Sequence, residues 1–124
     1  MSHGFVYLAR NASMPGLYKI GSTSNSPTFR IRQLSSSTSV PSPFELMGYC
    51  EIELPRNFEA QLHKDYAEYR NSKNREFFRL SDGILDDIRW LFSISGNSHW
   101  IDADAFDYEM THASSFSEGA KIEH

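Results

Sequence analysis

Apolar and polar residues alternate near the start of the chain in a pattern that predicts a β-hairpin. Residues 4–10 (GFVYLAR) and 17–22 (LYKIGS) have the period of two that is typical of half-buried strands. Between them lies Pro15-Gly16, a pair that suits the two central positions of a type II turn. The two strands are therefore expected to pair in antiparallel fashion.

The second of these strands carries Tyr18 and Lys19 side by side. Neighbouring side chains in a strand point to opposite faces of the sheet. Lys19 therefore shares its face with Gly21. Tyr18 shares the opposite face with Ile20. Alternation alone leaves open which of the two pairs lies on the face of Tyr7.

Farther along the chain, apolar residues recur at helical spacing in three segments. The pair Ser26-Pro27 combines a preferred capping residue with a preferred first residue, so the first helix is expected to begin there. Alternation in FELMGYCEI predicts a third strand between the first and second helices. The helices are expected over residues 28–34, 56–70 and 83–95, and the third strand over 44–52.

These elements predict an α+β domain of order β-β-α-β-α-α, with a small three-stranded antiparallel sheet flanked by helices. The stretch REFFRL (75–80) is expected to be short and extended or irregular. No period is sustained from Gly96 onward. We therefore expect a domain over residues 1–95 and an acidic extension over 96–124 that is partly docked, through Trp100 among others, or flexible.

Length and composition narrow the class of protein. A chain of 124 residues suits one domain with a single hydrophobic core. No apolar run approaches the roughly 18 residues that span a bilayer, so no membrane partner is expected. Cys50 is the only cysteine, which predicts no internal disulfide and a reducing compartment, the cytoplasm.

The net charge of −4 hides an uneven distribution of charged residues. Residues 1–81 carry ten Lys/Arg against seven Asp/Glu, a net charge of +3, whereas residues 82–124 carry two against nine, a net charge of −7. The body is therefore compatible with a polyanionic partner. The acidic extension is expected to weaken the binding of such a partner by charge repulsion.

Six phrases within residues 4–80 resemble, in their order, the motifs of the GIY-YIG endonuclease superfamily. They are FVYL, LYKIGST, RIRQL, PFELMG, FEAQLHKDY and REFFRL. The second reads KIG rather than YIG, which is similar to the phage-type branch of the superfamily. Each phrase alone is a weak signal, but their order on the expected strands and helices is specific.

The resemblance implies a metal-dependent endonuclease that hydrolyses phosphodiester bonds in nucleic acid, with DNA favoured over RNA. Carried over by motif, the catalytic residues are Tyr7, Lys19, Arg30 and Glu59, and Gly21 is a structural residue of the second motif. Glu59 would hold one Mg²⁺ or Mn²⁺ ion, which keeps most of its waters when a single carboxylate binds it. Lys19 would then face the site, and Tyr18 would pack in the core.

Two residues compete for the role of general base. An unperturbed tyrosine, with a pKa near 10, is a poor base at neutral pH. Lys19, Arg30 and the metal ion are expected to favour the phenolate of Tyr7 and so to lower its pKa. The same cations would lower the pKa of Lys19, which keeps Lys19 as the alternative base.

One position departs from the superfamily pattern. Leu34 stands where many members carry a His or Tyr helper, one turn after the arginine. His63, one turn after Glu59, is a candidate replacement, and Glu76 is a second candidate for a supporting role. The departure favours an alternative function, a catalytically inactive module that binds nucleic acid or protein. Because so small a domain has little surface for sequence readout, a homodimer or a protein partner is also expected.

Overall fold

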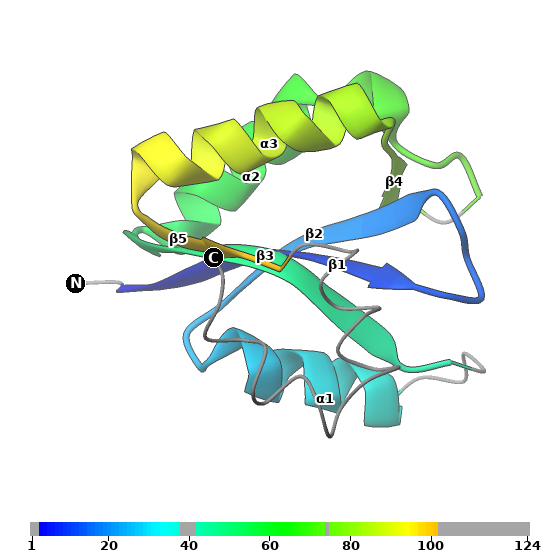
Figure 1. Cartoon of the computed structure of the whole chain (residues 1–124), viewed down its shortest axis with the longest axis horizontal. Helices are drawn as coiled ribbons and strands as arrows, with labels where there is room; N and C mark the ends of the chain where they lie inside the picture. Colours follow the sequence, from blue (N-terminus) through cyan, green and yellow to red (C-terminus); the bar gives the residue numbers. More distant parts are fainter. Residues whose placement is uncertain (1–2, 38–41, 74, 102–124) are drawn as a thin grey trace, which may run out of the picture.

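A single five-stranded sheet lies between two layers of helix in the computed structural model, which describes residues 3–37, 42–73 and 75–101 (Figure 1). The elements are β1 (His3–Asn11), β2 (Leu17–Thr23), α1 (Pro27–Ser37), β3 (Phe44–Glu53), α2 (Pro55–Asp65), the 3₁₀ helix η1 (Ala67–Tyr69), β4 (Phe77–Arg79), α3 (Asp82–Ser95) and β5 (Asn97–Trp100). The strand order is β4-β2-β1-β3-β5, and neighbouring strands are antiparallel. α2 and α3 cover one face of the sheet and α1 covers the other.

The predicted hairpin between β1 and β2 is confirmed, including its turn. The amide of Leu17 donates a hydrogen bond to the carbonyl oxygen of Met14 at 3.2 Å, which closes a four-residue turn. Gly16 has φ +83° at the third position of this turn. A type II turn requires a positive φ there, which only glycine adopts at no steric cost.

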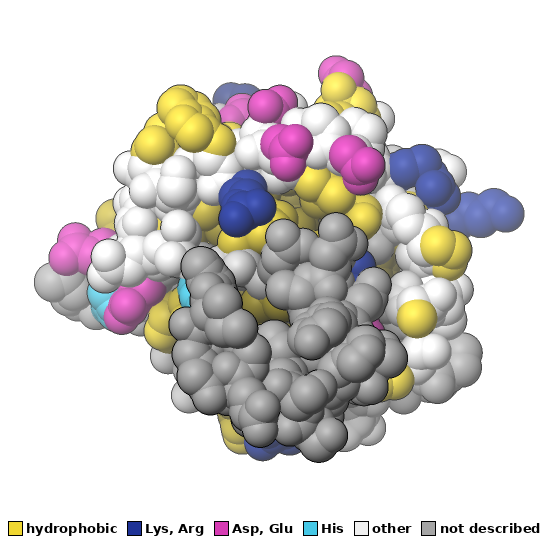
Figure 2. Space-filling model, viewed as in Figure 1, with side chains coloured by type: hydrophobic (Ala, Val, Ile, Leu, Met, Phe, Trp, Pro, Cys, Tyr) yellow, Lys and Arg dark blue, Asp and Glu magenta, His cyan; other side chains and the backbone are white. Residues whose placement is uncertain are grey.

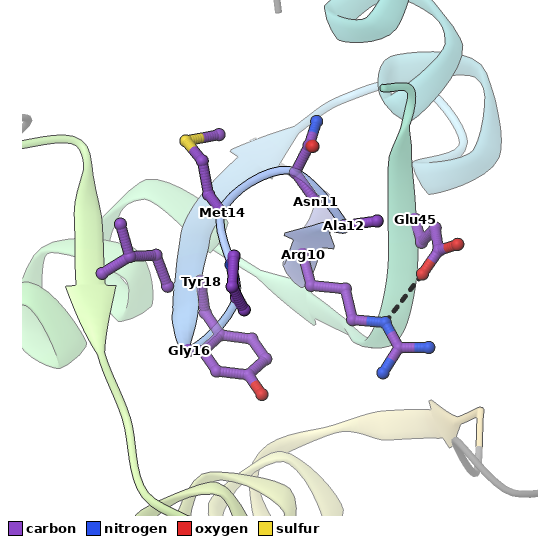
Figure 3. Close-up of a pocket in the computed structure, with 9 residues that line it drawn as sticks. Arg10, Asn11, Ala12, Met14, Gly16, Tyr18 and Glu45 are labelled. Carbon is purple, nitrogen blue, oxygen red and sulfur yellow. Dashed lines mark hydrogen bonds and ion pairs between the residues drawn. The ribbon is translucent and has the colours of Figure 1, made fainter. Parts of the chain in front are cut away.

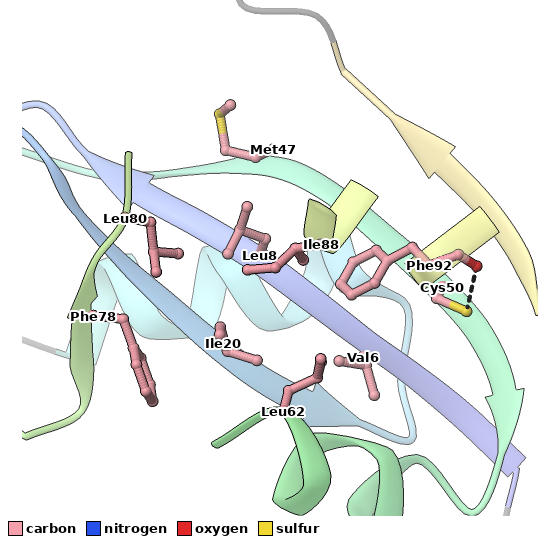
Figure 4. Close-up of a cluster of buried hydrophobic side chains, with 10 residues drawn as sticks. All are labelled: Val6, Leu8, Ile20, Met47, Cys50, Leu62, Phe78, Leu80, Ile88 and Phe92. Atoms are coloured by element: carbon pink, nitrogen blue, oxygen red, sulfur yellow. Dashed lines mark hydrogen bonds between the residues drawn. The ribbon is translucent and has the colours of Figure 1, made fainter. Parts of the chain in front are cut away.

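Each face of the sheet buries its own apolar cluster. The cluster beneath α2 and α3 is the larger (Figure 4). Tyr18 packs against it. The cluster beneath α1 contains Tyr7 and Ala9 from β1. Burial of each large apolar side chain stabilises the fold by about 1.5–3 kcal/mol. The larger cluster comprises Val6, Leu8, Ile20, Met47, Cys50, Leu62, Phe78, Leu80, Ile88 and Phe92.

α1 and α3 begin close to their predicted positions because a serine caps each of them. The Ser26 hydroxyl accepts a hydrogen bond from the Phe29 amide at 3.2 Å, and the Ser81 hydroxyl accepts one from the Ile84 amide at 3.4 Å. The segment predicted as one helix over 56–70 is instead divided into α2 and η1. None of the helices among the described residues has the length and apolar character that crossing a bilayer requires.

The predicted three-stranded sheet is wrong in strand number, and so is the element order derived from it. β4 pairs with β2, and β5 pairs with β3, which adds one strand at each edge. These strands have three and four residues, too few for alternation to register as a period. In β4, moreover, Phe77 and Phe78 are both buried, one in each apolar cluster, so these neighbouring residues do not alternate between apolar and polar.

β5 lies just past the predicted domain boundary at residue 95 and belongs to the same sheet. Trp100 packs against the larger cluster, with its ring 6.0 Å from that of Phe92 in an edge-on contact. The rest of the predicted acidic extension, residues 102–124, lies outside the described residues.

Replacing Trp100 with Ala is expected to destabilise the protein by about 2–3 kcal/mol, somewhat less than the loss of a fully buried tryptophan. Trp90, on α3, is 61% exposed, so Trp90→Ala is a matched control that should change stability by less than about 0.5 kcal/mol. Urea unfolding followed by circular dichroism measures both. Equal stability of the two variants would show that β5 does not unfold with the rest of the sheet.

Candidate active site

The ring of Tyr7 lies across Gly21 on the neighbouring strand. The two residues are directly paired between β1 and β2, and Tyr7 is 1% exposed. A Cβ atom at position 21 would stand 2.5 Å from the Tyr7 hydroxyl oxygen and 2.6 Å from the carbon that bears it. Gly21 is therefore required for space rather than for backbone conformation. It lets the phenol extend across β2 toward the edge of that strand.

Arg30, on α1, approaches Tyr7 from the helix that covers this face. Its guanidinium favours the phenolate of Tyr7 and so acts to lower the pKa of that residue. Burial nevertheless raises the pKa of Tyr7 above its ordinary value of 10.0, because desolvation disfavours the phenolate more than Arg30 favours it. The negative charges of Glu59 and Glu76 raise that pKa further. Arg30 thus lowers the Tyr7 pKa as expected, but burial outweighs it, and the contribution expected of a metal ion stays a prediction.

Glu59 reaches the same strand from the other side of the sheet. Its carboxylate accepts a short hydrogen bond from the Ser22 hydroxyl, and Ser22 points to the face covered by α2. β4 pairs with β2 only at residues 17–19, so no strand of the described part of the chain lies beside the edge of β2 beyond Lys19. The negative charge of Glu59 acts across this edge on Tyr7, whose pKa it raises.

His63 closes part of this edge. Its Nε2 donates a hydrogen bond to the Ile20 carbonyl oxygen at 2.8 Å and lies 3.6 Å from a Glu59 carboxylate oxygen. Its Nδ1 lies 3.3 Å from a guanidinium nitrogen of Arg70, which can only donate. Because both ring nitrogens have partners, His63 is arranged to support the edge of β2 rather than to transfer protons.

Lys19 lies on the same face of β2 as Gly21, beside Ala9 of β1, and thus on the face of Tyr7. Its ammonium is 3.2 Å from a carboxylate oxygen of Glu76. The Lys19 side chain is 16% exposed and that of Glu76 is 73% exposed, so the carboxylate approaches from solvent. Much of the Lys19 charge is therefore offset before any substrate binds.

The structure brings together the residues that the sequence predicted and adds one that it did not. Ser22, which holds Glu59, was missed. Its position directly after Gly21 was a usable signal, because alternation turns its hydroxyl toward the opposite face, where the second helix packs. Leu34 packs against the smaller apolar cluster beneath α1 and contributes no polar group.

A single divalent ion fits the donors at this edge. Glu59 is half-buried, and no Lys or Arg pairs with it in the described part of the chain. Among the described residues, no group of three or more His, Cys, Asp and Glu side chains is placed to hold a metal ion. An ion bound here would therefore depend on one carboxylate and on water, the arrangement that Mg²⁺ commonly accepts.

A separate cavity of about 380 Å³ lies at the hairpin turn, away from this edge (Figure 3). Tyr18 lines it together with Arg10 and Glu45, which form an ion pair at 2.7 Å. Because Tyr18 also packs against the larger cluster, it lies on the face opposite Lys19. Lys19 and Gly21 are therefore the pair that shares the face of Tyr7.

Comparison with known proteins identifies one domain family. The sequence profile of the T5orf172 domain matches residues 4–93, from β1 into α3. This domain is found in phage and related nuclease-like proteins. No curated protein and no solved structure matches the chain.

The raised pKa of Tyr7 predicts that this residue ionises above pH 10 in the folded protein without metal. The measurement is an absorbance titration in EDTA, taken as the difference between the wild type and Tyr7→Phe. Arg30→Gln should move the midpoint higher still, because Arg30 favours the phenolate. A midpoint at or below 10 would contradict the dominance of burial.

The same shift links stability to pH. The folded pKa lies above the unfolded one, so the stability associated with the neutral phenol is fully present below the unfolded pKa. It should be lost as the pH rises through the folded value. Tyr7→Phe should remove this alkaline part of the pH dependence.

Proposed function

Since the chain belongs to the T5orf172 domain family, we propose that it is a metal-dependent endonuclease of the GIY-YIG type. Its substrate is nucleic acid, with DNA favoured over RNA, and its reaction is hydrolysis of a phosphodiester bond. The family is loosely associated with nuclease-like function. The observation that carries the proposal is the arrangement around β2: Tyr7 lies across Gly21, Lys19 shares the face of Gly21, and Glu59 is hydrogen-bonded to the next residue, Ser22.

The cationic residues at this edge suit a phosphodiester. The guanidinium of Arg30 offers several donors in a fixed plane, one of which is 3.5 Å from the side-chain oxygen of Gln33. The remaining donors can bind the non-bridging oxygens of a phosphate, where negative charge grows as the bond breaks. Lys19 can exchange its exposed partner Glu76 for the phosphate, since both are anionic.

Glu59 would hold one Mg²⁺ or Mn²⁺ ion, with Ser22 fixing the other side of its carboxylate. When bound, such an ion polarises the phosphate and lowers the pKa of a bound water. Glu76 remains a candidate second carboxylate, because its charge also reaches Tyr7. His63 would keep Glu59 and the Ile20 carbonyl in register.

Tyr7 enters the reaction as a neutral phenol, because its pKa is raised. A neutral phenol donates a hydrogen bond and so can orient a water molecule or a phosphate oxygen beside Arg30. The attacking water must also lose a proton, to either Tyr7 or Lys19. Tyr7 would accept it only as the phenolate, which requires further positive charge near its oxygen. A pH–rate profile of Lys19 and Tyr7 variants distinguishes the two.

Surface charge is consistent with a polyanion that approaches away from α3. Figure 2 shows Asp and Glu side chains over α3, which carries Asp82, Asp86 and Asp87, and Lys and Arg side chains where the loop before β4 lies. α3 covers the face opposite α1, so this acidic surface does not cover Tyr7. We place the protein in the cytoplasm, since Cys50 is a buried free thiol. A second copy or a protein partner would add sequence specificity.

A second candidate function is binding without turnover. Leu34 fills the helper position with an apolar side chain, and Glu76 offsets the charge of Lys19. Both features would suit a module that binds nucleic acid or protein on the same fold and does not cut. Nicking of supercoiled DNA in the presence of Mg²⁺ separates this candidate from the nuclease.

Replacing Glu59 with Ala is expected to abolish metal-dependent nicking of supercoiled DNA, because the metal loses its carboxylate. The fold should persist, since Glu59 is only half-buried and lies outside both apolar clusters. Asp65→Ala, which removes an exposed acid from the same helix, is the matched control and should cut normally. Undiminished nicking by Glu59→Ala would refute the metal assignment.

Lys19→Met keeps the aliphatic stem of the side chain while removing its charge. Single-turnover cleavage should fall by about two powers of ten, as when one charge interaction specific to the transition state is lost. The melting temperature should hardly change, because an exposed ion pair such as Lys19–Glu76 contributes less than about 1 kcal/mol. Tyr18→Phe, on the opposite face, is the control. A dead Tyr18→Phe beside an active Lys19→Met would reject this arrangement.

A further inference from the structure

Three ring side chains form a row on the sheet face that carries Tyr7. They are Phe5 of β1, Tyr49 of β3 and His99 of β5. Tyr49 is paired with Tyr7 on one side and with His99 on the other, so one rung of the sheet crosses all three strands. The ring centroid of Tyr49 is 5.7 Å from that of Phe5 and 5.6 Å from that of His99. We call Phe5, Tyr49 and His99 the aromatic row.

α1 packs toward the other end of this face. The apolar cluster beneath α1 includes Phe44 and Leu46, which pair with the last residues of β1. Tyr49, like Leu46, is partly buried and packs against this cluster, whereas neither Phe5 nor His99 belongs to it. Phe5 and Tyr49 are partly exposed and His99 is exposed, on a strand at the edge of the sheet. Among the described residues, Phe5 and His99 therefore make their ring contacts with Tyr49, which also packs against the cluster beneath α1.

We propose that the aromatic row binds unpaired bases of the nucleic-acid strand whose phosphodiester lies at Tyr7. The proposal rests on the function proposed above and narrows its substrate class to nucleic acid with unpaired or everted nucleotides near the cleavage site. Aromatic rings on an open sheet face stack with any base, because every base has a π-face. Bases inside a duplex are already stacked and present no free face to the row.

Continuity with the candidate active site favours nucleic acid as the occupant. The rung Gly21–Tyr7–Tyr49–His99 runs without interruption from the edge of β2 to the edge of β5. Arg30, on the helix that covers this face, favours the phenolate of Tyr7 at the start of this rung and supplies positive charge for the backbone of the same strand. Glu51 is paired with Phe5 in the sheet. Its carboxylate oxygen is 2.9 Å from the Nε2 of His3, so it has a partner when a phosphate approaches.

Cross-strand aromatic pairs also stabilise sheets, and this bland explanation makes a different prediction. If the row were only structural, loss of the exposed His99 ring would affect neither binding nor much of the stability. If the row stacks with bases, loss of His99 should weaken the binding of a single strand and leave the melting temperature unchanged.

The test uses a short single-stranded DNA that carries 2-aminopurine, whose fluorescence falls when it stacks, and a duplex of the same sequence, both in EDTA with the full chain. His99→Ala should weaken single-strand binding about tenfold, as for the loss of one stacked base, and should reduce the quenching. His99→Tyr should restore or tighten binding. Trp90→Ala, which removes an exposed ring from α3, should bind as the wild type does.

Three results would overturn the proposal: equal binding of the single strand by His99→Ala and wild type, preference for the duplex, or equal weakening by Trp90→Ala. Concentration-dependent dimerisation that is lost in His99→Ala would instead assign the row to a second copy of the chain. A nicking assay of Glu59→Ala distinguishes failure of this inference from failure of the proposed nuclease function. If that variant still cuts while His99→Ala loses single-strand binding, the metal assignment fails and the row stands.

Discussion

The close contact of the Tyr7 ring with Gly21 is the constraint on which the candidate site depends. A phenol can cross the neighbouring strand only where that strand has no side chain, and the register of β1 with β2 places the glycine directly opposite. The hydroxyl then stands over β2 rather than within the apolar cluster from which its ring comes. The guanidinium of Arg30, on α1, favours the phenolate of this hydroxyl, and the negative charges of Glu59 and Glu76 disfavour it.

Burial and position at an edge have opposite effects on this group. Burial makes the phenolate costly, so the pKa of Tyr7 is raised although Arg30 acts to lower it. Because β4 is short, no described strand lies beside the last residues of β2. Side chains of α2 reach this edge, where Glu59 contacts Ser22 and His63 contacts the Ile20 carbonyl. The site is thus partly dry and partly open, as a reaction between a bound phosphate and water would need.

On the other face of the sheet, a second glycine likewise leaves space for a large ring of the neighbouring strand. Gly48 on β3 is paired with Trp100 of β5, and a side chain at position 48 would collide with the indole ring. One glycine therefore seats Tyr7 beneath α1, and another seats Trp100 beneath α2 and α3. A glycine in a strand loses packing of its own, but here a large ring from the next strand fills the space.

Local patterns in the sequence were enough for the hairpin, its type II turn, the starts of the helices and the α+β class. Each of these depends on neighbours within a few residues, such as Pro15-Gly16 or the capping serines Ser26 and Ser81. Alternation also separated Lys19 from Tyr18, and the order of the motifs singled out Tyr7, Arg30 and Glu59. Only the tertiary structure decided the five strands, because β4 and β5 are too short for periodicity and exist through pairing with distant strands. It alone also decided the direction of the Tyr7 pKa and the contact of Ser22 with Glu59. Desolvation and meeting across a strand edge depend on what surrounds a residue in space, which the sequence order does not record.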